Sequence, residues 1–308
     1  MNKLSKISNL FKKYCISCIT KGPLFVHLSP LTSCNLKCEY CYQIDETHDL
    51  MSIELFKKVL NQCIKLNVGI IAFTGGEPLL WQPLENALML CKKVGIFTQI
   101  TTNGFLLNKN KIDELANCGL DMLSISIDGY DKLFYSSKTI SNNSQAFEIL
   151  CYAKERYGII VSTNMVLTLN NIDQLNKLTD YAHHYKIPQS IGLYVPPPNK
   201  ENNFSYNFTD LKNIQEAIKS IVDKKARGYD ILDPSMYYEK YISFLKGQYS
   251  WDCNIAKKRT LQIGPDGSVY WCTKLCEKSP YNIMEMNLAT YLQLKSKLSE
   301  IIKFCNNN

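Results

Sequence analysis

The sequence contains no apolar run that approaches the roughly 18 residues needed to cross a bilayer. Its first 19 residues mix four lysines into their apolar positions, so they lack the hydrophobic region of a secretion signal. The basic residues form no block, although 35 of them against 28 acidic residues give a net charge of +7. We therefore expect a cytoplasmic protein that binds neither membrane nor nucleic acid.

The chain also lacks the low hydrophobicity that keeps disordered proteins unfolded, since 45% of its residues are hydrophobic and 20% are charged. Its 308 residues allow one large domain, or one large and one small domain. Cysteine is abundant, with 13 copies. An odd number of cysteines without a secretion signal argues against a disulfide framework and indicates metal or redox chemistry.

From Phe25 to Val195, short β-rich runs alternate with amphipathic stretches, which is typical of a parallel α/β domain. The strands are expected at Phe25–Leu31, Gly69–Thr74, Ile96–Thr102, Met122–Ile127, Ile159–Thr168 and Ile191–Val195. The helices between them are expected at Ile53–Leu66, Leu84–Lys93, Lys111–Cys118, Ser144–Tyr157 and Ile172–Tyr185. Ser52 is the expected N-cap of the first of these helices.

Residues 196–207, which begin with three prolines, end this pattern and indicate a linker. A helix is expected at Asp210–Arg227 and a final helix at Leu288–Phe304, and the chain beyond Trp251 is rich in cysteine. The expected organisation is a helical extension (1–21), an α/β core with its exit linker (22–208), a helical connection (209–250) and a small α+β domain (251–308).

The most informative motif is Cys34-x3-Cys38-x2-Cys41, which follows the first expected strand. Three thiolates can bind three irons of a [4Fe–4S] cube and leave the fourth iron open to a substrate. Two alternatives stay open on this motif alone. It can be a group of packed core cysteines, or a zinc site whose further ligand comes from Asp45, Glu46 or His48.

The second expected strand leads directly into Thr74-Gly75-Gly76-Glu77-Pro78. Two glycines let the backbone approach a ligand closely, and the Glu77 side chain or nearby carbonyls can accept a hydrogen bond from an ammonium group. The motif stands at the carboxyl end of a parallel strand, where α/β barrels have their active sites.

These two motifs and Ser126-Ile-Asp128-Gly129, in this order, resemble the motifs of radical S-adenosylmethionine (radical SAM) enzymes. The resemblance covers about residues 22–195 and implies a partial (β/α)6 TIM-like barrel. It implies that Cys34, Cys38 and Cys41 hold a [4Fe–4S] cluster whose open iron binds the amino and carboxylate groups of SAM. By the same resemblance, Tyr40 lies against the adenine of SAM. The methionyl amino group of SAM meets Gly75, Gly76 and Glu77.

The resemblance further implies that Ser126, Asp128 and Asn164 lie near the ribose and carboxylate of SAM. Asn103, at the end of the third expected strand, is expected to shape the same SAM-binding opening of the barrel. For Ser126 and Asn164 the alternative is a polar group that only caps a strand end.

In this family, one electron from the reduced cluster cleaves SAM, and the resulting 5′-deoxyadenosyl radical takes a hydrogen atom from the substrate. The cofactor supplies this chemistry, while the protein binds, orients and excludes water. A flavodoxin- or ferredoxin-type protein is the expected electron donor.

In the tail, Cys253, Gly267 and Cys272 resemble the Cys-x(9–15)-Gly-x4-Cys pattern of the SPASM/twitch extension, which holds auxiliary [4Fe–4S] clusters in part of the family. The Gly-Pro-Asp-Gly turn at 264–267 predicts a β-hairpin. One auxiliary cluster is expected, with Cys276, Cys305 or both as its remaining ligands. A zinc ribbon is the alternative.

The other cysteines are interpreted as packing residues. Cys15 and Cys18 stand on an expected amphipathic N-terminal helix together with Leu10 and Phe11. Four more fall in or at the ends of the expected barrel helices, at Cys63, Cys91, Cys118 and Cys151.

The first hypothesis for function is a maturase of a ribosomally synthesised peptide, which forms a crosslink, an epimer or an oxidised side chain. About 33 residues precede the cysteine motif, too few for the recognition domain of many peptide maturases, and this weakens the hypothesis. The second is a dehydrogenase or rearranging enzyme that acts on a small molecule such as a sugar or nucleoside. The third is a zinc or cluster protein without activity, which the intact motifs disfavour.

Overall fold

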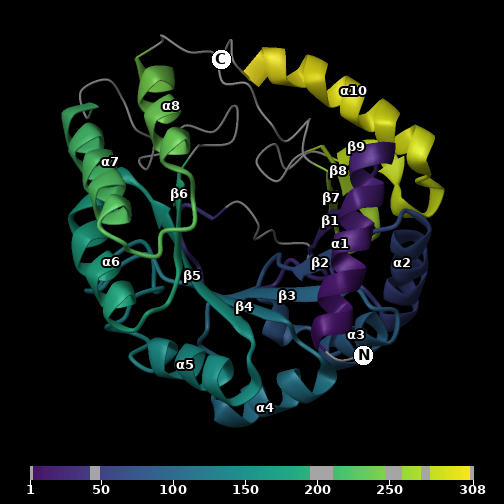
Figure 1. Cartoon of the computed structure of the whole chain (residues 1–308), viewed down its shortest axis with the longest axis horizontal. Helices are drawn as coiled ribbons and strands as arrows, with labels where there is room; N and C mark the ends of the chain where they lie inside the picture. The colour runs from purple at the N-terminus through teal and green to yellow at the C-terminus, as the bar shows by residue number, and fades with distance from the viewer. Residues whose placement is uncertain (1–2, 42–48, 195–210, 247–258, 272–277, 306–308) are drawn as a thin grey trace.

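The fold is taken from a computed structural model that describes residues 3–41, 49–194, 211–246, 259–271 and 278–305 (Figure 1). Six strands and the helices between them form the expected partial barrel. The strands are β1 (Phe25–Leu28), β2 (Ile70–Phe73), β3 (Phe97–Thr102), β4 (Met122–Ser126), β5 (Ile160–Leu167) and β6 (Gln189–Leu193). All five pairings between consecutive strands are parallel.

Several of the helices that cover the sheet begin or end with a recognisable cap. They are α2 (Ile53–Lys65), η1 (Pro78–Leu80), α3 (Leu84–Lys93), α4 (Lys109–Cys118), α5 (Ala146–Tyr157), η2 (Leu169–Gln174) and α6 (Leu175–His184). Ser52 accepts a hydrogen bond from the N–H of Leu55 (3.1 Å), as expected for an N-cap. Gly119 and Gly158 end α4 and α5 with positive φ angles, which glycine adopts without strain.

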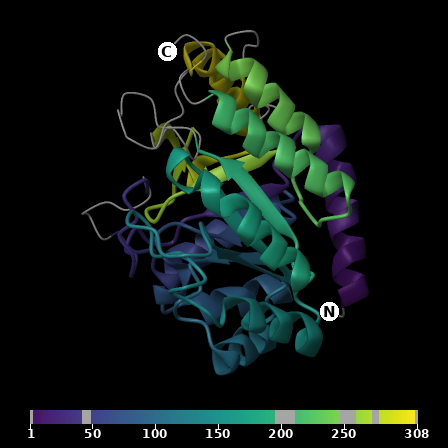
Figure 2. The ribbon, with the colours of Figure 1, turned by 90° about the vertical axis from the view of Figure 1, so that its left-hand side faces the viewer.

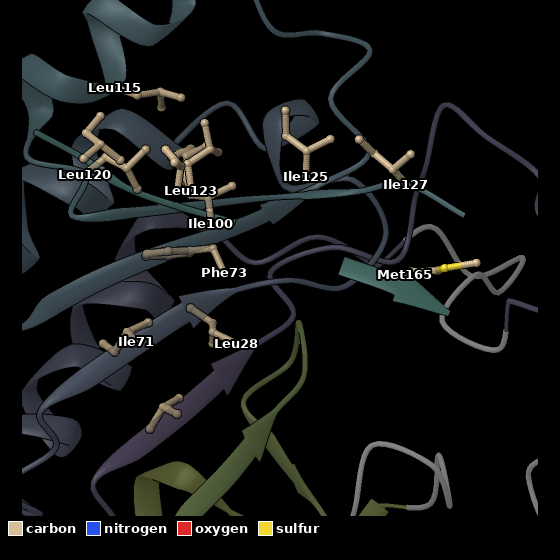
Figure 3. Close-up of a cluster of buried hydrophobic side chains, with 14 of the residues drawn as sticks. Leu28, Ile71, Phe73, Ile100, Leu115, Leu120, Leu123, Ile125, Ile127 and Met165 are labelled. Atoms are coloured by element: carbon tan, nitrogen blue, oxygen red, sulfur yellow. The ribbon is translucent and has the colours of Figure 1, made fainter. Parts of the chain in front are cut away.

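The two faces of the sheet differ in burial and polarity. Along β1 and β3 fully buried residues alternate with half-buried ones. The buried set faces the helices, where Phe73 packs against Phe56 of α2 and against Trp81. Figure 3 shows part of this core, with Leu28, Ile71 and Ile100 from the sheet and Leu115 from α4. The half-buried set therefore faces the inside of the barrel.

The N-terminal helix α1 (Lys3–Thr20) lies across the amino ends of the strands. Lys6 Nζ is 2.7 Å from the carboxylate of Asp121, just before β4. Asn9 Nδ2 donates to the carbonyl of Gly95 before β3 (2.9 Å), and Lys13 Nζ donates to that of Val68 before β2 (2.7 Å). In Figure 2 the helix runs along one edge of the molecule. The described part of the barrel is therefore covered by α1 at its amino end.

The packing expected of the N-terminal cysteine pair is wrong for Cys18, which is exposed, whereas Cys15 is half-buried. The helix attaches to the barrel mainly through its polar residues, so Phe11 on another face is 66% exposed. Among the barrel cysteines, Cys63 and Cys91 are buried as expected, and two others are half-buried at the edge of the core, Cys118 and Cys151.

The tail continues the barrel sheet. Strand β7 (Thr260–Ile263) pairs in parallel with β1, so that Phe25 lies opposite Thr260. Antiparallel β8 (Ser268–Tyr270) and β9 (Lys278–Asn282) complete a nine-stranded sheet of order β6-β5-β4-β3-β2-β1-β7-β8-β9. The expected hairpin is confirmed, because the N–H of Gly267 donates to the carbonyl of Gly264 (3.1 Å) and Gly267 has a φ of 81°. The tail is thus joined to the core by main-chain hydrogen bonds.

The remaining helices are α7 (Leu211–Ala226), α8 (Ser235–Leu245), η4 (Ile283–Glu285) and α10 (Leu288–Cys305). Helices α7 and α8 fall in the stretch predicted to be a helical connection and lie side by side in Figures 1 and 2. None of the helices within the described ranges is long and apolar enough to span a bilayer.

The ion pair that attaches α1 gives a test of its role. Asp121 accepts hydrogen bonds from Lys6 and from the N–H of Thr98 (2.9 Å); the Lys6 side chain is buried and that of Asp121 is 13% exposed. Replacing Asp121 with alanine leaves a buried ammonium without its partner, so we expect a loss of about 3–5 kcal/mol in the free energy of unfolding. The measurement is a urea titration followed by circular dichroism.

The matched control is Glu54→Ala, which removes an exposed ion pair with Lys57 (3.0 Å). An exposed pair contributes about 0–1 kcal/mol. Equal midpoints for the two variants would show that α1 does not depend on Asp121.

Candidate functional site

The cysteine motif lies on the loop after β1, and the glycine motif holds this loop in place. The N–H of Gly76 donates to the carbonyl of Leu31 (3.1 Å), and that of Glu77 donates to the carbonyl of Ser33 (2.9 Å). A Cβ on Gly76 would overlap the Ser33 carbonyl, and a Cβ on Gly75 would lie 2.6 Å from the Leu31 oxygen. Only glycine permits this close approach of the two loops.

The three motif cysteines are half-buried on this loop. The Cys34 sulfur accepts from the N–H of Leu36 (3.4 Å) and from Asn103 Nδ2 (3.8 Å). The Cys38 sulfur lies 3.5 Å from Ser136 Oγ. Burial raises the pKa of the Cys34 thiol, while the N–H of Leu36 opposes this effect.

No three histidine, cysteine, aspartate or glutamate side chains in the described ranges gather around one point as ligands of a single ion do. This holds for Cys34, Cys38 and Cys41 as well. A [4Fe–4S] cube takes one thiolate per iron, so its ligands need not meet at one point. Three half-buried thiols on one loop, with two N–H donors to the Cys34 sulfur, fit such a cluster. The candidate zinc ligands Asp45, Glu46 and His48 lie outside the described residues.

Glu77 is buried and links the ends of two strands. Its carboxylate accepts from Thr102 Oγ1 (2.6 Å) and from the N–H groups of Asn103 (2.8 Å) and Leu79 (3.1 Å). Burial raises the pKa of Glu77, against the effect of these hydrogen bonds and of the Lys138 ammonium. A carboxylate offers about four acceptor positions, so one is left for an ammonium group such as that of SAM.

Asn103 connects this carboxylate to the cysteine loop. Its side chain donates to Asn35 Oδ1 (2.7 Å) as well as to Cys34, and its Oδ1 accepts from the N–H of Phe105 (3.0 Å). The structure therefore brings Glu77, Asn103 and Cys34 together at the carboxyl end of the strands.

Asp128 lies in a second group of hydrogen-bonded residues beside the cysteine loop. Its carboxylate is fully buried and accepts from Tyr40 OH (2.5 Å), Ser136 Oγ (2.8 Å) and the N–H of Val166 (3.2 Å). Lys138 Nζ lies 3.2 Å from the same carboxylate. Asp128 thus holds Tyr40 in place.

Tyr40 is itself nearly buried. Its ring meets the edges of Tyr135 and Tyr194, each with 6.1 Å between centroids, and Lys138 Nζ lies 4.8 Å from its centroid. Burial and the neighbouring Asp128 raise the pKa of Tyr40 well above its ordinary value, so its hydroxyl stays a donor.

Ser126 and Asn164 end up side by side. They are half-buried register partners: Ser126 is the last residue of β4, and Asn164 lies in β5 with three strand residues after it. Below them on the inner face, Ser162 Oγ donates to Ser124 Oγ (3.2 Å). Other polar residues on this face are His27, Gln99, Thr101 and Gln262.

The strands β1 to β7 place polar and apolar side chains but no charged ones on the inner face, and one carboxylate reaches this face at its edge, where Ser190 Oγ donates to Asp233 (3.0 Å). The alternation of the described strands places no lysine, arginine, aspartate or glutamate on that face. Groups bound there meet amides, hydroxyls and the imidazole of His27. Such a surface favours neutral partners that form hydrogen bonds.

Most cysteines of the tail lie outside the residues that the structure describes. Cys253, Cys272 and Cys276 are outside the described residues, and Cys305 is the last residue of α10. The auxiliary cluster therefore stays a prediction.

The sequence interpretation missed Ser136 and Lys138, which join Asp128, Tyr40 and Cys38. Both belong to the irregular segment between β4 and α5, where no periodicity or spacing marks a functional residue. Only the fold brings them to the cysteine loop.

The sequence profile of the Radical SAM superfamily matches residues 28–182. A protein named probable GTP 3′,8-cyclase from Methanococcus maripaludis is 28% identical over 201 residues, which are 64% of this chain and 66% of the relative. A protein of the same name from Methanococcus aeolicus is 27% identical over 206 residues, 65% of this chain and 68% of the relative. The chain thus matches about two thirds of the length of these relatives.

Two solved structures share the fold. One is SuiB from Streptococcus suis bound to precursor peptide SuiA, with a TM-score of 0.70 at 18% identity, covering 97% of this chain and 72% of that one. The other is native anSMEcpe with bound AdoMet and Cp18Cys peptide, with a TM-score of 0.68 at 20% identity, covering 91% of this chain and 83% of that one. At these identities the likeness extends to the fold alone.

The contact between the glycine and cysteine loops gives a second test. Gly76→Ala places a methyl group on the Ser33 carbonyl, so we expect the cysteine loop to move and the stability to fall by about 1–3 kcal/mol. Iron bound after anaerobic reconstitution should fall with it.

The matched control is Gly192→Ala in β6, where the new methyl would have one neighbour, the Met165 carbonyl, at 3.8 Å. It should keep its iron and its melting temperature. Normal iron binding by Gly76→Ala would mean that the close approach is dispensable.

Proposed function

Because the chain belongs to the radical SAM superfamily, we propose that it matures a ribosomally synthesised peptide by crosslinking, epimerisation or oxidation. It is an enzyme that uses a [4Fe–4S] cluster and SAM, as the superfamily does. When bound, the reduced cluster supplies the electron that converts SAM into a 5′-deoxyadenosyl radical, which removes a hydrogen atom from the substrate. A flavodoxin- or ferredoxin-type protein is the proposed electron donor.

In this proposal Cys34, Cys38 and Cys41 hold the cluster. The SAM-binding residues are proposed to be Tyr40, Gly75, Gly76, Glu77, Asn103, Ser126 and Asn164, with Asp128 acting through Tyr40. Glu77 orients Asn103 by accepting from its N–H, and Asn103 in turn donates to Cys34. The chain's own residues thereby fix the cysteine loop relative to the ends of β2 and β3.

The observation that carries the peptide proposal is that strands β1 to β7 place no lysine or arginine on the inner face of the barrel. A nucleoside triphosphate carries several negative charges, and proteins bind such groups through arginine, lysine or metal ions. The inner face of β1 to β7 offers Gln99, Gln262 and hydroxyl groups instead. Peptide amides and neutral side chains match these groups, and the folds of SuiB and anSMEcpe are known with peptides bound.

A small-molecule substrate is the alternative, because the curated relatives are named probable GTP 3′,8-cyclases. A sugar or nucleoside without phosphates would also suit a neutral, hydrogen-bonding surface. This alternative differs from the first in its product, so mass spectrometry separates the two.

The tail is proposed to hold one auxiliary [4Fe–4S] cluster through Cys253 and Cys272 with Cys276, Cys305 or both. In support, β7 and β8 form the hairpin that the cysteine pattern requires, and β7 is anchored to β1. Four thiolates would close this cluster, whereas three would leave an iron for the substrate.

The first prediction from this function concerns the barrel cysteines. Replacing Cys34, Cys38 and Cys41 with alanine should abolish formation of 5′-deoxyadenosine. Reconstituted wild-type protein should carry about eight irons, as two cubes of four, and the triple variant about four. Undiminished 5′-deoxyadenosine in the triple variant would disprove the assignment, and about four irons with one zinc in the wild type would make the tail a zinc ribbon.

The second prediction concerns the inner face. Gln99→Leu removes one neutral hydrogen-bonding group, so we expect product formation at limiting peptide to fall about 2- to 10-fold, the effect of about 0.5–1.5 kcal/mol. Gln145→Leu, at an exposed position outside the barrel, is the control. The assay incubates the protein anaerobically with SAM, dithionite and a candidate peptide or GTP, and mass spectrometry detects the product. Turnover of GTP but of no peptide would reject the peptide proposal.

A further inference from the structure

A buried cation stands beside the cysteine loop without an assigned role. The side chain of Lys138 is 13% exposed, and its ammonium lies 3.2 Å from the fully buried carboxylate of Asp128. On its other side it faces the ring of Tyr40, one residue before Cys41. The Lys138 side chain thus lies beside the cysteine loop and is largely shielded from solvent.

The backbone and side chains around this ion pair hold it firmly. The N–H of Asp128 donates to the carbonyl of Lys138 (2.6 Å), and Asn171 Nδ2 donates to the carbonyl of Asp128 (2.9 Å). Asp128 accepts from Ser136, whose oxygen also lies 3.5 Å from the Cys38 sulfur. Only the Ser136 hydroxyl therefore separates the carboxylate from a cluster ligand.

The charge of Lys138 interacts with the charges of its neighbours. Burial lowers the pKa of Lys138, but the negative charges of Asp128, Cys38 and Cys41 raise it above its ordinary value. Lys138 therefore remains an ammonium ion. The Lys138 charge in turn acts on Glu77 at the other end of the site.

We propose that Lys138 and Asp128 set the reduction potential of the cluster held by Cys34, Cys38 and Cys41, with opposite effects. Reduction adds one electron from the donor and makes the cluster more negative by one charge. A fixed cation nearby stabilises the reduced state and a fixed anion stabilises the oxidised state, and both effects are strong where water is excluded. The two residues act through the cluster and need no contact with the substrate. The inference rests on the superfamily's cluster and not on the identity of the substrate.

The experiment measures the reduced fraction of the cluster by electron paramagnetic resonance at fixed applied potentials, without SAM or substrate. The variant with Cys34, Cys38 and Cys41 changed to alanine supplies the background of any other cluster. Lys138→Met should lower the ratio of reduced to oxidised cluster at least tenfold, which corresponds to 59 mV for one electron. Asp128→Asn should raise the ratio at least tenfold.

Three further variants separate charge from structure. Lys138→Arg keeps the cation and should match the wild type, and the double variant Lys138→Met/Asp128→Asn should fall between the two single variants. Lys132→Met removes an exposed lysine from the same segment and should leave the potential unchanged, because solvent screens that charge.

The inference is overturned if Lys138→Met and Asp128→Asn shift the potential in the same direction, or if neither differs from Lys132→Met. If Lys138→Met does not retain the cluster, the comparison of Asp128→Asn and Lys138→Arg with the wild type decides. Loss of the cluster from all of these variants, including Lys138→Arg, would show that the network is structural and would also overturn the inference. Peptide turnover plays no part in these outcomes, so a wrong substrate proposal would be recognised separately.

Discussion

The site depends on the close approach of two loops, Gly75-Gly76 after β2 and Leu31-Ser33 after β1. Two main-chain hydrogen bonds join them, and any side chain at Gly76 would occupy the position of the Ser33 carbonyl. Cys34 is the next residue along the chain, so this contact fixes where the cysteine loop leaves the sheet. The glycines therefore make room for the protein's own backbone as well as for any ligand.

Two buried carboxylates then hold the cysteine loop at separate points. Glu77 acts through Asn103, which donates to Cys34, and Asp128 acts through Ser136, next to Cys38. A buried carboxylate must be paired or hydrogen-bonded, and both satisfy this need with groups at the ends of neighbouring strands. The same hydrogen bonds that stabilise these carboxylates thus connect β2 to β3, and β4 to β5.

Much of the fold follows from local patterns, because strands such as β3 and β5 are short β-branched runs between well-capped helices. The cysteine, Gly-Gly-Glu and Ser-x-Asp motifs were identifiable for a similar reason, since each is a fixed local spacing at a strand end. The pairing of β7 with β1 joins distant parts of the chain and leaves no local signal. Lys138 and the inward turn of Asp128 likewise depend on the irregular segment after β4, where backbone geometry decides which side chains meet.

The charged residues of the site lie apart from the face of the barrel that is proposed to bind the substrate. Glu77, Asp128 and Lys138 surround the cysteine loop at the carboxyl end of the strands, where the proposed cluster would accept an electron. Further into the barrel the described strands place no charged side chain on the inner face, and α1 covers the amino end. Removal of a hydrogen atom transfers no net charge, so the residues around the substrate need to supply position rather than electrostatic stabilisation. In the proposed function, hydrogen-bonding groups without charge on the inner face would orient a substrate and add no charge near the cluster.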